Sequence, residues 1–157
     1  MRLSVPEDKK LLFELTMPTR WGDMDAFNHI NNVSYFRFME CIRMDWLHSL
    51  GLNDKSATAR VIILNAFCNF YHQLFYPGDL RLKLFASEPA RKTFESWTTI
   101  ERIDQPGKIY AGGGATMVWV NLTTERAEDL HAWILELVSE LFFPTVMVDF
   151  FARPICS

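Results

Sequence analysis

Side chains that can hold and transform a reacting group are concentrated in one stretch, residues 20–32. This stretch contains two carboxylates, Asp23 and Asp25, one imidazole, His29, and three asparagines. Carboxylates and imidazoles are common groups of acid–base and nucleophilic catalysis. A long apolar segment, residues 33–50, follows directly. The stretch therefore predicts a site in which polar groups meet the start of a buried helix.

The apolar segment has the periodicity of a helix. Its apolar residues recur at three- and four-residue spacing between Val33 and Leu50. Asn28 or Asn31 could cap the N-terminus, and Gly51 is a natural stop at the C-terminus. Apolar residues lie on both flanks of this helix, which leaves only a narrow polar side. We therefore expect the helix to be enclosed by other elements.

The other segments have the pattern of β-strands. Alternating, β-branched and aromatic residues predict strands at 11–17, 60–74, 80–87, 92–103 and 108–121. Turn sequences at 76–79, 88–90 and 104–107 separate the last four strands. Strands joined by short turns after a single long helix predict an α+β fold. We expect an antiparallel sheet of about five strands wrapped around one long central helix.

Three glycines, Gly112, Gly113 and Gly114, lie inside the last expected strand, where glycine normally weakens pairing. We interpret them as a bulge or bend that lets the sheet curl around the helix. A ligand-binding role is the alternative. The run lacks the strand–GxGxxG–helix context of a nucleotide site, which favours the structural interpretation.

Length and composition indicate a single globular domain. The 157 residues are 49% hydrophobic and 22% charged. A net charge of -3 at pH 7 argues against a broadly basic protein that binds nucleic acid. The three cysteines form no CxxC pair, residues 1–10 lack an apolar signal core, and no apolar run could span a bilayer. These features predict a cytoplasmic protein without a disulfide framework or membrane partner.

The run from Arg20 to Tyr35, Arg-Trp-Gly-Asp-Met-Asp-Ala-Phe-Asn-His-Ile-Asn-Asn-Val-Ser-Tyr, closely resembles the acyl-CoA thioesterases of the hotdog fold. It is most similar to their 4-hydroxybenzoyl-CoA thioesterase-like branch, over about residues 11–121. The resemblance implies a helix gripped by a curved antiparallel sheet, in a homodimer or homotetramer whose paired subunits form one continuous sheet. It also implies hydrolysis of an acyl-CoA thioester in a cleft at the subunit interface, without a metal or bound cofactor.

The resemblance also implies roles for individual residues. Asp25 matches the catalytic carboxylate that attacks the thioester or activates water; aspartate also caps turns, but the surrounding pattern favours catalysis. Asn32 matches the helix position whose backbone N–H points at the thioester oxygen. His29 could polarise the thioester, orient Asp25 or close the loop by a hydrogen bond. Asp23 is a candidate acid–base partner that we interpret as a turn-former instead.

Other residues are candidates for binding the substrate. Phe27 and Tyr35 suggest an apolar or aromatic acyl pocket. Glu40 is the alternative base, because another hotdog branch uses a helix glutamate and an ionisable group on an enclosed helix needs a partner. The phosphates of CoA require a basic rim, for which the candidates are Arg81, Lys83, Arg91 and Lys92. Charges that alternate along a strand also mark its solvent face, which is the competing interpretation of these four residues.

Two other functions compete with thioester hydrolysis. A hotdog hydratase or dehydratase carries a Gly-Asp-x-Asn-Pro-x-His type of motif. Gly22 and Asp23 followed by His29 lack the proline, and their spacing is one residue too long. A non-catalytic module that binds acyl thioesters is the other alternative, and the presence of Asp25 argues against it.

The C-terminal residues differ in character from the rest. We expect a hotdog domain at 1–124 and an atypical extension at 125–157, packed on the same domain. Residues 125–140 predict an amphipathic helix with Leu130, Trp133 and Ile134 on its apolar face. Residues 142–157 are strongly apolar and are expected to pack on the sheet or in an interface.

Overall fold

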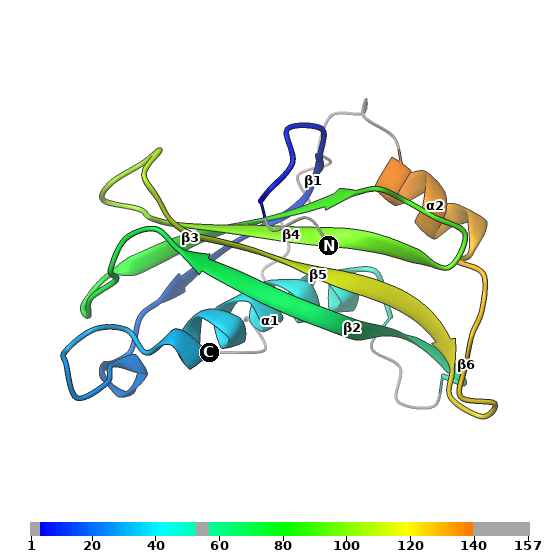
Figure 1. Cartoon of the computed structure of the whole chain (residues 1–157), viewed down its shortest axis with the longest axis horizontal. Helices are drawn as coiled ribbons and strands as arrows, with labels where there is room; N and C mark the ends of the chain where they lie inside the picture. The colour runs from blue at the N-terminus through cyan, green and yellow to red at the C-terminus, as the bar shows by residue number, and fades with distance from the viewer. Residues whose placement is uncertain (1–3, 53–56, 140–157) are drawn as a thin grey trace.

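One long helix lies against a curved antiparallel sheet in the computed structural model, which describes residues 4–52 and 57–139 (Figure 1). In these residues the six strands follow the order β1-β3-β4-β5-β2, with the short β6 paired to β5. The elements, in chain order, are β1 (Lys10–Pro18), a 3-10 turn (Trp21–Asp23), α1 (Asn32–Ser49), β2 (Ala59–Phe70), β3 (Asp79–Ser87), β4 (Thr93–Arg102), β5 (Ile109–Asn121), β6 (Arg126–Ala127) and α2 (Ala132–Ser139). The α+β architecture expected from the sequence is confirmed.

Helix α1 begins and ends as its sequence predicts. The Asn31 side chain accepts a hydrogen bond from the Val33 N–H at 3.0 Å, so Asn31 is the N-cap. At the other end, Gly51 has a φ of +73°, and its N–H donates to the His48 carbonyl. The Leu52 N–H donates to the Leu47 carbonyl, which completes the double hydrogen bond of a Schellman motif.

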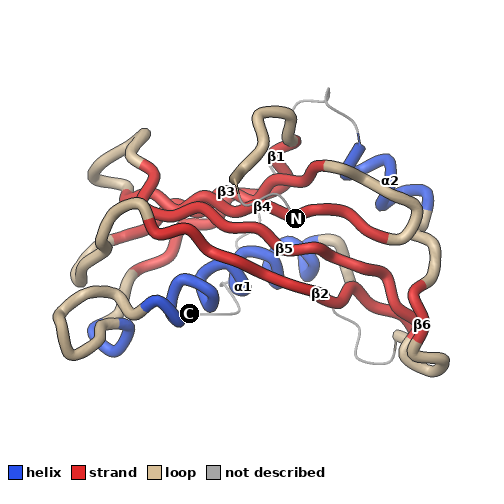
Figure 2. Tube along the Cα trace, in the orientation of Figure 1, coloured by secondary structure: helices blue, strands red, loops and turns tan. Residues whose placement is uncertain are grey.

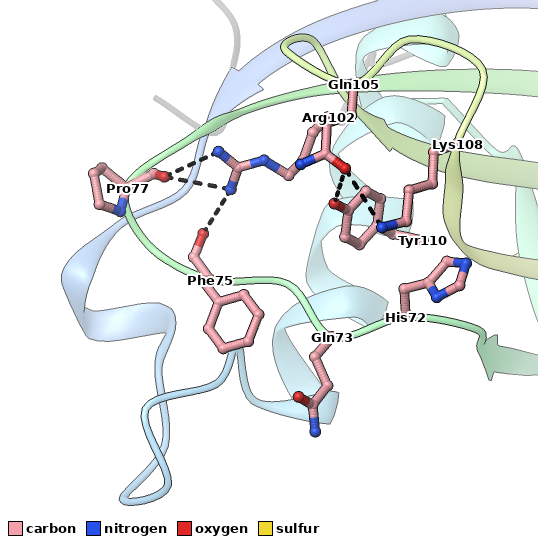
Figure 3. Close-up of a pocket in the computed structure, with 8 residues that line it drawn as sticks. All are labelled: His72, Gln73, Phe75, Pro77, Arg102, Gln105, Lys108 and Tyr110. Carbon is pink, nitrogen blue, oxygen red and sulfur yellow. Dashed lines mark hydrogen bonds between the residues drawn. The ribbon is translucent and has the colours of Figure 1, made fainter.

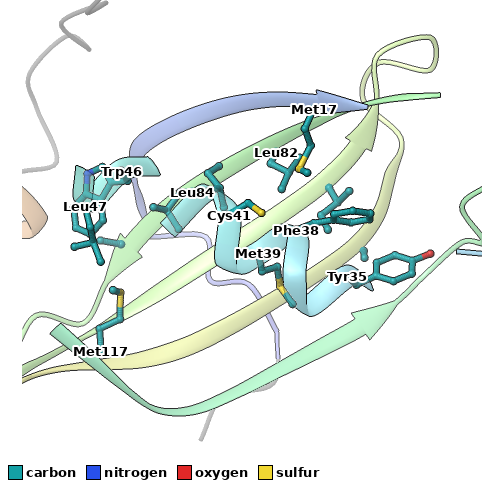
Figure 4. Close-up of a cluster of buried hydrophobic side chains, with 14 of the residues drawn as sticks. Met17, Tyr35, Phe38, Met39, Cys41, Trp46, Leu47, Leu82, Leu84 and Met117 are labelled. Atoms are coloured by element: carbon teal, nitrogen blue, oxygen red, sulfur yellow. The ribbon is translucent and has the colours of Figure 1, made fainter. Parts of the chain in front are cut away.

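The buried side of α1 forms the core with the sheet. Phe38, Met39 and Ile42 are almost fully buried and belong to one cluster with Leu82 and Leu84 of β3 (Figure 4). Between its two terminal residues, which are also exposed, the exposed residues of α1 form a stripe along the opposite side, at Val33, Phe36, Arg37, Glu40, Met44 and His48. Of the helices in the two described ranges, none is long and apolar enough to cross a bilayer.

Strand β2 is shorter than the sequence suggests. The alternating pattern predicts a strand to residue 74, but β2 ends at Phe70. Beyond it the N–H groups of Tyr71 and His72 both donate to the Tyr110 carbonyl, and the Leu74 carbonyl accepts from Ile30. The segment 71–74 therefore leaves the sheet and connects it to the polar turn before α1.

The three glycines of β5 do not form a bulge. The pairing of β5 with β2 runs without a shift from Gly114 to Gly112, and so does its pairing with β4. A Cβ on Gly113 would lie 2.6 Å from the Met39 Sδ and closer still to the Phe67 carbonyl oxygen. Of the expected bulge or bend, the bulge is therefore wrong, and the bend stays a prediction. Gly113 instead provides the space in which α1 approaches the sheet.

The helix expected at residues 125–140 starts later than predicted. Arg126 and Ala127 pair with β5, so their backbone is committed to the sheet, and α2 begins only at Ala132. Leu130 and Ile134 are buried in the common core, as predicted, but Trp133 is 43% exposed. Helix α2 contacts β1 and β3. Residues 142–157, for which packing on the sheet or in an interface was expected, lie outside the described residues.

Candidate active site

The polar turn before α1 is closed by its own backbone. The Asp25 N–H donates to the His29 carbonyl at 2.8 Å, and the Asn28 N–H donates to the Asp25 carbonyl at 3.1 Å. Asn28 adopts a positive φ of 61°, which asparagine tolerates better than most residues. The Ile30 N–H donates to the Leu74 carbonyl at 2.9 Å. These bonds fix the turn to the segment that follows β2.

Asp23 holds the base of this turn. Its carboxylate is buried, accepts a hydrogen bond from the Arg20 N–H at 2.8 Å and forms an ion pair with Arg37. Its carbonyl accepts from the Asn31 N–H and the Ser34 hydroxyl. These contacts agree with the interpretation of Asp23 as a turn-former.

One carboxylate oxygen of Asp25 makes structural contacts, and the other is available. Its Oδ1 accepts hydrogen bonds from the Phe27 N–H at 2.8 Å and the His29 N–H at 3.3 Å. Within the described part of the chain, no hydrogen bond to its Oδ2 is found. The turn-capping role of aspartate and a chemical role are therefore compatible, because each uses a different oxygen.

Asp25 lines a hollow of about 310 Å³ at the start of α1. The lining residues are Asp25, His29, Ile30, Asn32, Tyr35, Phe70, Tyr71, His72 and Gln73. The structure therefore brings together four residues that the sequence selected, Asp25, His29, Asn32 and Tyr35. Figure 2 shows why: the turn and the segment after β2 lie at the same end of the sheet, on the left of the view.

The N-terminus of α1 supplies a free hydrogen-bond donor to this hollow. The Val33 N–H is taken by the Asn31 side chain, and the Ser34 N–H donates to the Asn31 carbonyl. Among the described residues, no acceptor is found for the N–H of Asn32, which lines the hollow. Free N–H groups and the helix dipole at such a position favour a negatively charged oxygen.

Two aromatic contacts position the walls of the hollow. The Tyr35 hydroxyl accepts a hydrogen bond from the Leu74 N–H at 3.3 Å, and burial raises the pKa of Tyr35, so its hydroxyl stays protonated at neutral pH. Its ring packs against Phe70, with the ring centroids 5.0 Å apart. The His29 ring packs edge-on against Phe75 at 5.1 Å. These rings hold the turn against the segment after β2.

Two sequence candidates lie away from the hollow. Phe27 is 80% exposed at the tip of the turn and is not among the lining residues. Glu40 interacts electrostatically with Arg43, so it has the kind of partner that was expected, but it lies on the exposed stripe of α1 and not in an enclosed position. The reason is that, within this chain, the sheet covers only one side of α1.

The four basic candidates do not line the hollow either. Arg81 pairs with Glu101 at 3.2 Å, and Lys83 lies 3.9 Å from Glu14. Arg91 pairs with Asp129 at 3.3 Å, and the Lys92 ammonium donates to the Ala127 carbonyl at 2.7 Å. Arg91 and Lys92 precede β4, whose first residue pairs with Val118, whereas the hollow lies near the start of β5. Within this chain these two residues therefore lie at the opposite end of the sheet from Asp25.

The segment 70–73 is the part of the site that the sequence interpretation missed. Phe70, Tyr71, His72 and Gln73 all line the hollow. Their alternating pattern was attributed to a strand, and His72 had no motif to single it out. The strong turn at 76–79 was the only local signal that the chain leaves the sheet nearby.

Comparison with known proteins identifies the family. Residues 19–138 match the model of the thioesterase-like superfamily. A "putative esterase" from Aquifex aeolicus is 31% identical over 75 residues, which are 46% of this chain and 59% of that protein. The match thus spans less than two thirds of that relative's length.

Two solved structures show the same architecture. One is a "putative thioesterase" from Pseudomonas aeruginosa, with a TM-score of 0.76 and 26% identity over 80% of this chain and 96% of that one. The other is a "putative acyl-CoA thioesterase" from Xanthomonas campestris, with a TM-score of 0.62 and 27% identity over 70% of this chain and 93% of that one.

The sheet wrapped around α1, with a polar turn at the helix start, defines the class as the hotdog fold. The chain belongs to the thioesterase-like superfamily. The resemblance identified from residues 20–35 is therefore confirmed for family and fold.

Proposed function

We propose that this protein hydrolyses an acyl-CoA thioester to a free acid and CoA. One observation carries the proposal: Asp25 and the free N–H of Asn32 line the same hollow. A carboxylate oxygen and an oxyanion donor are the two groups that acyl transfer from a reactive thioester requires. The family membership and the similarity to an acyl-CoA thioesterase support the same function.

The proposed reaction uses the unoccupied oxygen of Asp25. As a base, Oδ2 takes a proton from water while the water oxygen attacks the thioester carbon. The Asn32 N–H stabilises the oxyanion that forms. When the carbon–sulfur bond breaks, the CoA thiolate takes the proton from Asp25, and the carboxylate is restored. As a nucleophile, Oδ2 would itself attack the carbon and expel the CoA thiolate; water would then hydrolyse the resulting anhydride, which restores the carboxylate, releases the acid and supplies the proton that the thiolate takes.

The remaining residues of the hollow have supporting roles in this proposal. The protonated Tyr35 hydroxyl and the Phe70 ring form the wall against which the acyl group packs. His29 contacts Phe75 through its ring and binds Asp25 through its backbone, so we assign it the role of positioning the carboxylate.

We also propose that two copies of the chain pair through β2. This strand is at the edge of the sheet, and its apolar residues Ile62, Ile63 and Leu64 are 39%, 38% and 62% exposed. A long apolar edge strand is a liability unless another chain covers it. Val33 and Phe36 of α1 are exposed as well, so a partner would also cover the start of the helix.

A cytoplasmic location is part of the proposal. Burial raises the pKa of the Cys68 thiol to about 12, so this free cysteine is protonated and unreactive at neutral pH. The free thiol of Cys68 suits a reducing compartment, whereas Cys41 is disulfide-bonded and does not support that part of the proposal.

Release of free CoA thiol from a panel of aryl and fatty acyl-CoA thioesters tests the proposed hydrolysis. Asp25→Asn keeps the Oδ1 contacts with the backbone but removes the basic oxygen. We expect kcat to fall by about 10²–10⁴, the usual contribution of a general acid or base. The folded state of the variant is checked by its thermal unfolding midpoint.

Three outcomes would contradict the proposal. Turnover by Asp25→Asn at the wild-type rate would exclude this carboxylate as the reactive group. Binding of acyl-CoA without thiol release across the panel would indicate a non-catalytic module. Loss of enoyl absorbance on incubation with an enoyl-CoA would indicate a hydratase.

A further inference from the structure

A second hollow, of about 560 Å³, adjoins the candidate active site. It is lined by His72, Gln73, Phe75, Pro77, Arg102, Gln105, Lys108 and Tyr110 (Figure 3). His72 and Gln73 also line the first hollow, so the two share one wall. The two hollows are therefore neighbours, on either side of these two residues.

The two cations of this hollow differ in their charge balance. The Arg102 guanidinium binds both oxygens of Asp104, at 2.8 and 2.7 Å, and its remaining donors reach the carbonyls of Phe75 and Pro77. Its charge is thus offset, and its donors are used to hold the loop. Because Asp79 also interacts with Arg102, this end of the hollow carries no excess positive charge.

Lys108 provides the excess positive charge at the other end. Its ammonium lies 3.4 Å from the Gln105 amide oxygen and 4.9 Å from the centroid of the Tyr110 ring. None of the ion pairs in the described part of the chain includes Lys108. Both of its contacts are neutral, and the Tyr110 hydroxyl holds the same Gln105 oxygen at 2.9 Å. An anion at this position would therefore meet an available ammonium group.

We propose that the second hollow binds the CoA part of the substrate and that Lys108 contacts its phosphates. This inference rests on the proposed acyl-CoA substrate. The Tyr110, His72 and Phe75 rings would contact the uncharged part of CoA, while Lys108 would contact its negatively charged phosphates. The assignment replaces the basic rim expected at Arg81, Lys83, Arg91 and Lys92, since each of those side chains is already engaged within the chain.

Titration of free CoA into Lys108→Ala and Lys108→Glu, followed by calorimetry, tests this assignment without any turnover. We expect roughly tenfold weaker binding for Lys108→Ala, a larger loss for Lys108→Glu and near wild-type affinity for Lys108→Arg. Lys9→Ala is the matched control, because Lys9 lies over the Phe85 ring, near the end of β3 remote from the hollow. It removes the same charge and should leave CoA affinity unchanged.

Kinetics distinguish the CoA part of the substrate from its acyl part. Lys108→Ala should raise KM for an acyl-CoA roughly tenfold without changing kcat, because contact with a remote phosphate is the same in ground and transition states. It should not change KM for the N-acetylcysteamine thioester of the same acid, which has no phosphates. Equal CoA affinity in wild type, Lys108→Ala and Lys108→Glu would overturn the assignment. An equal rise in KM for the truncated thioester in Lys108→Ala would overturn it as well. Lys108-dependent binding of CoA without thiol release would instead contradict only the proposed hydrolysis.

Discussion

At the scale of single residues, some polar groups of the site make structural contacts and others are available for chemistry. Asp25 uses one oxygen for the turn and leaves the other available, while Asp23 is fully committed to Arg20 and Arg37. Two aspartates two positions apart therefore have different environments. The Asn31 side chain and carbonyl accept hydrogen bonds from the N–H groups of Val33 and Ser34, whereas no acceptor for the Asn32 N–H is found among the described residues.

Replacement of Asn32 tests whether its backbone, rather than its side chain, stabilises the oxyanion. Proline is tolerated at the first position of a helix, and Asn31 already has the extended conformation that a following proline requires, with φ -58° and ψ 139°. Asn32→Pro removes the N–H, and kcat should fall by about 10²–10³. Asn32→Ala keeps the N–H and should stay within a few-fold of wild type. If the two variants have the same kcat, this N–H is not the oxyanion donor.

At the scale of elements, the position of the site depends on how closely α1 approaches β5. Gly113 lies opposite Cys68 of β2 in the ladder, and its missing side chain leaves the space that Met39 of α1 occupies. Since Asn32 and Tyr35 lie on the same helix, any displacement of α1 from the sheet would widen the hollow.

Gly113→Ala tests this close approach. The added methyl group would overlap the Met39 sulfur and the Phe67 carbonyl, and we expect a loss of roughly 1–3 kcal/mol in the free energy of unfolding. Gly22→Ala is the control, because a Cβ there meets no atom within 4 Å. Urea denaturation of both variants measures the difference. If Gly113→Ala has the same free energy of unfolding as the wild type, α1 can move away from the sheet without loss of stability, which would contradict this prediction.

At the scale of the whole molecule, one edge of the sheet carries exposed apolar residues, among them Ile62, Ile63 and Leu64. Strand order places β2 at the border of the sheet, next to the exposed stripe of α1. The hollow is lined in part by Phe70 at the end of the same strand. A second copy paired along β2 would therefore lie next to the candidate active site.

Leu64→Lys tests the proposed pairing. Leu64 lies at the register shift between Ile63 and Asn65 and is 62% exposed, so a lysine there disturbs the edge without entering the core. In light scattering after size exclusion, we expect the wild type to be a dimer or tetramer and the variant to be a monomer. Trp133→Lys makes the same kind of change on α2, which packs on β1 and β3, and should not alter the assembly. A wild-type protein that is monomeric at all concentrations would contradict the proposal.

The sequence by itself determined the features that depend on near neighbours in the chain. A helix N-cap at Asn28 or Asn31, the stop at Gly51 and the grouping of Asp25, His29 and Asn32 all arise within a few residues, because helix ends and turns are set by local backbone geometry; the structure selects Asn31 as the cap. The strand positions followed from alternation for the same reason.

Only the tertiary structure decided what depends on distant pairing. The register of β3 against β4 brings Arg81 to Glu101, and the exit of the chain from β2 brings residues 70–73 to the polar turn. The fit of α1 on β5 gives Gly113 its role, and the end of the sheet where the loops meet places Lys108 beside the candidate site. Such contacts join residues tens of positions apart, so their identity depends on strand register and on the surfaces that the folded elements cover.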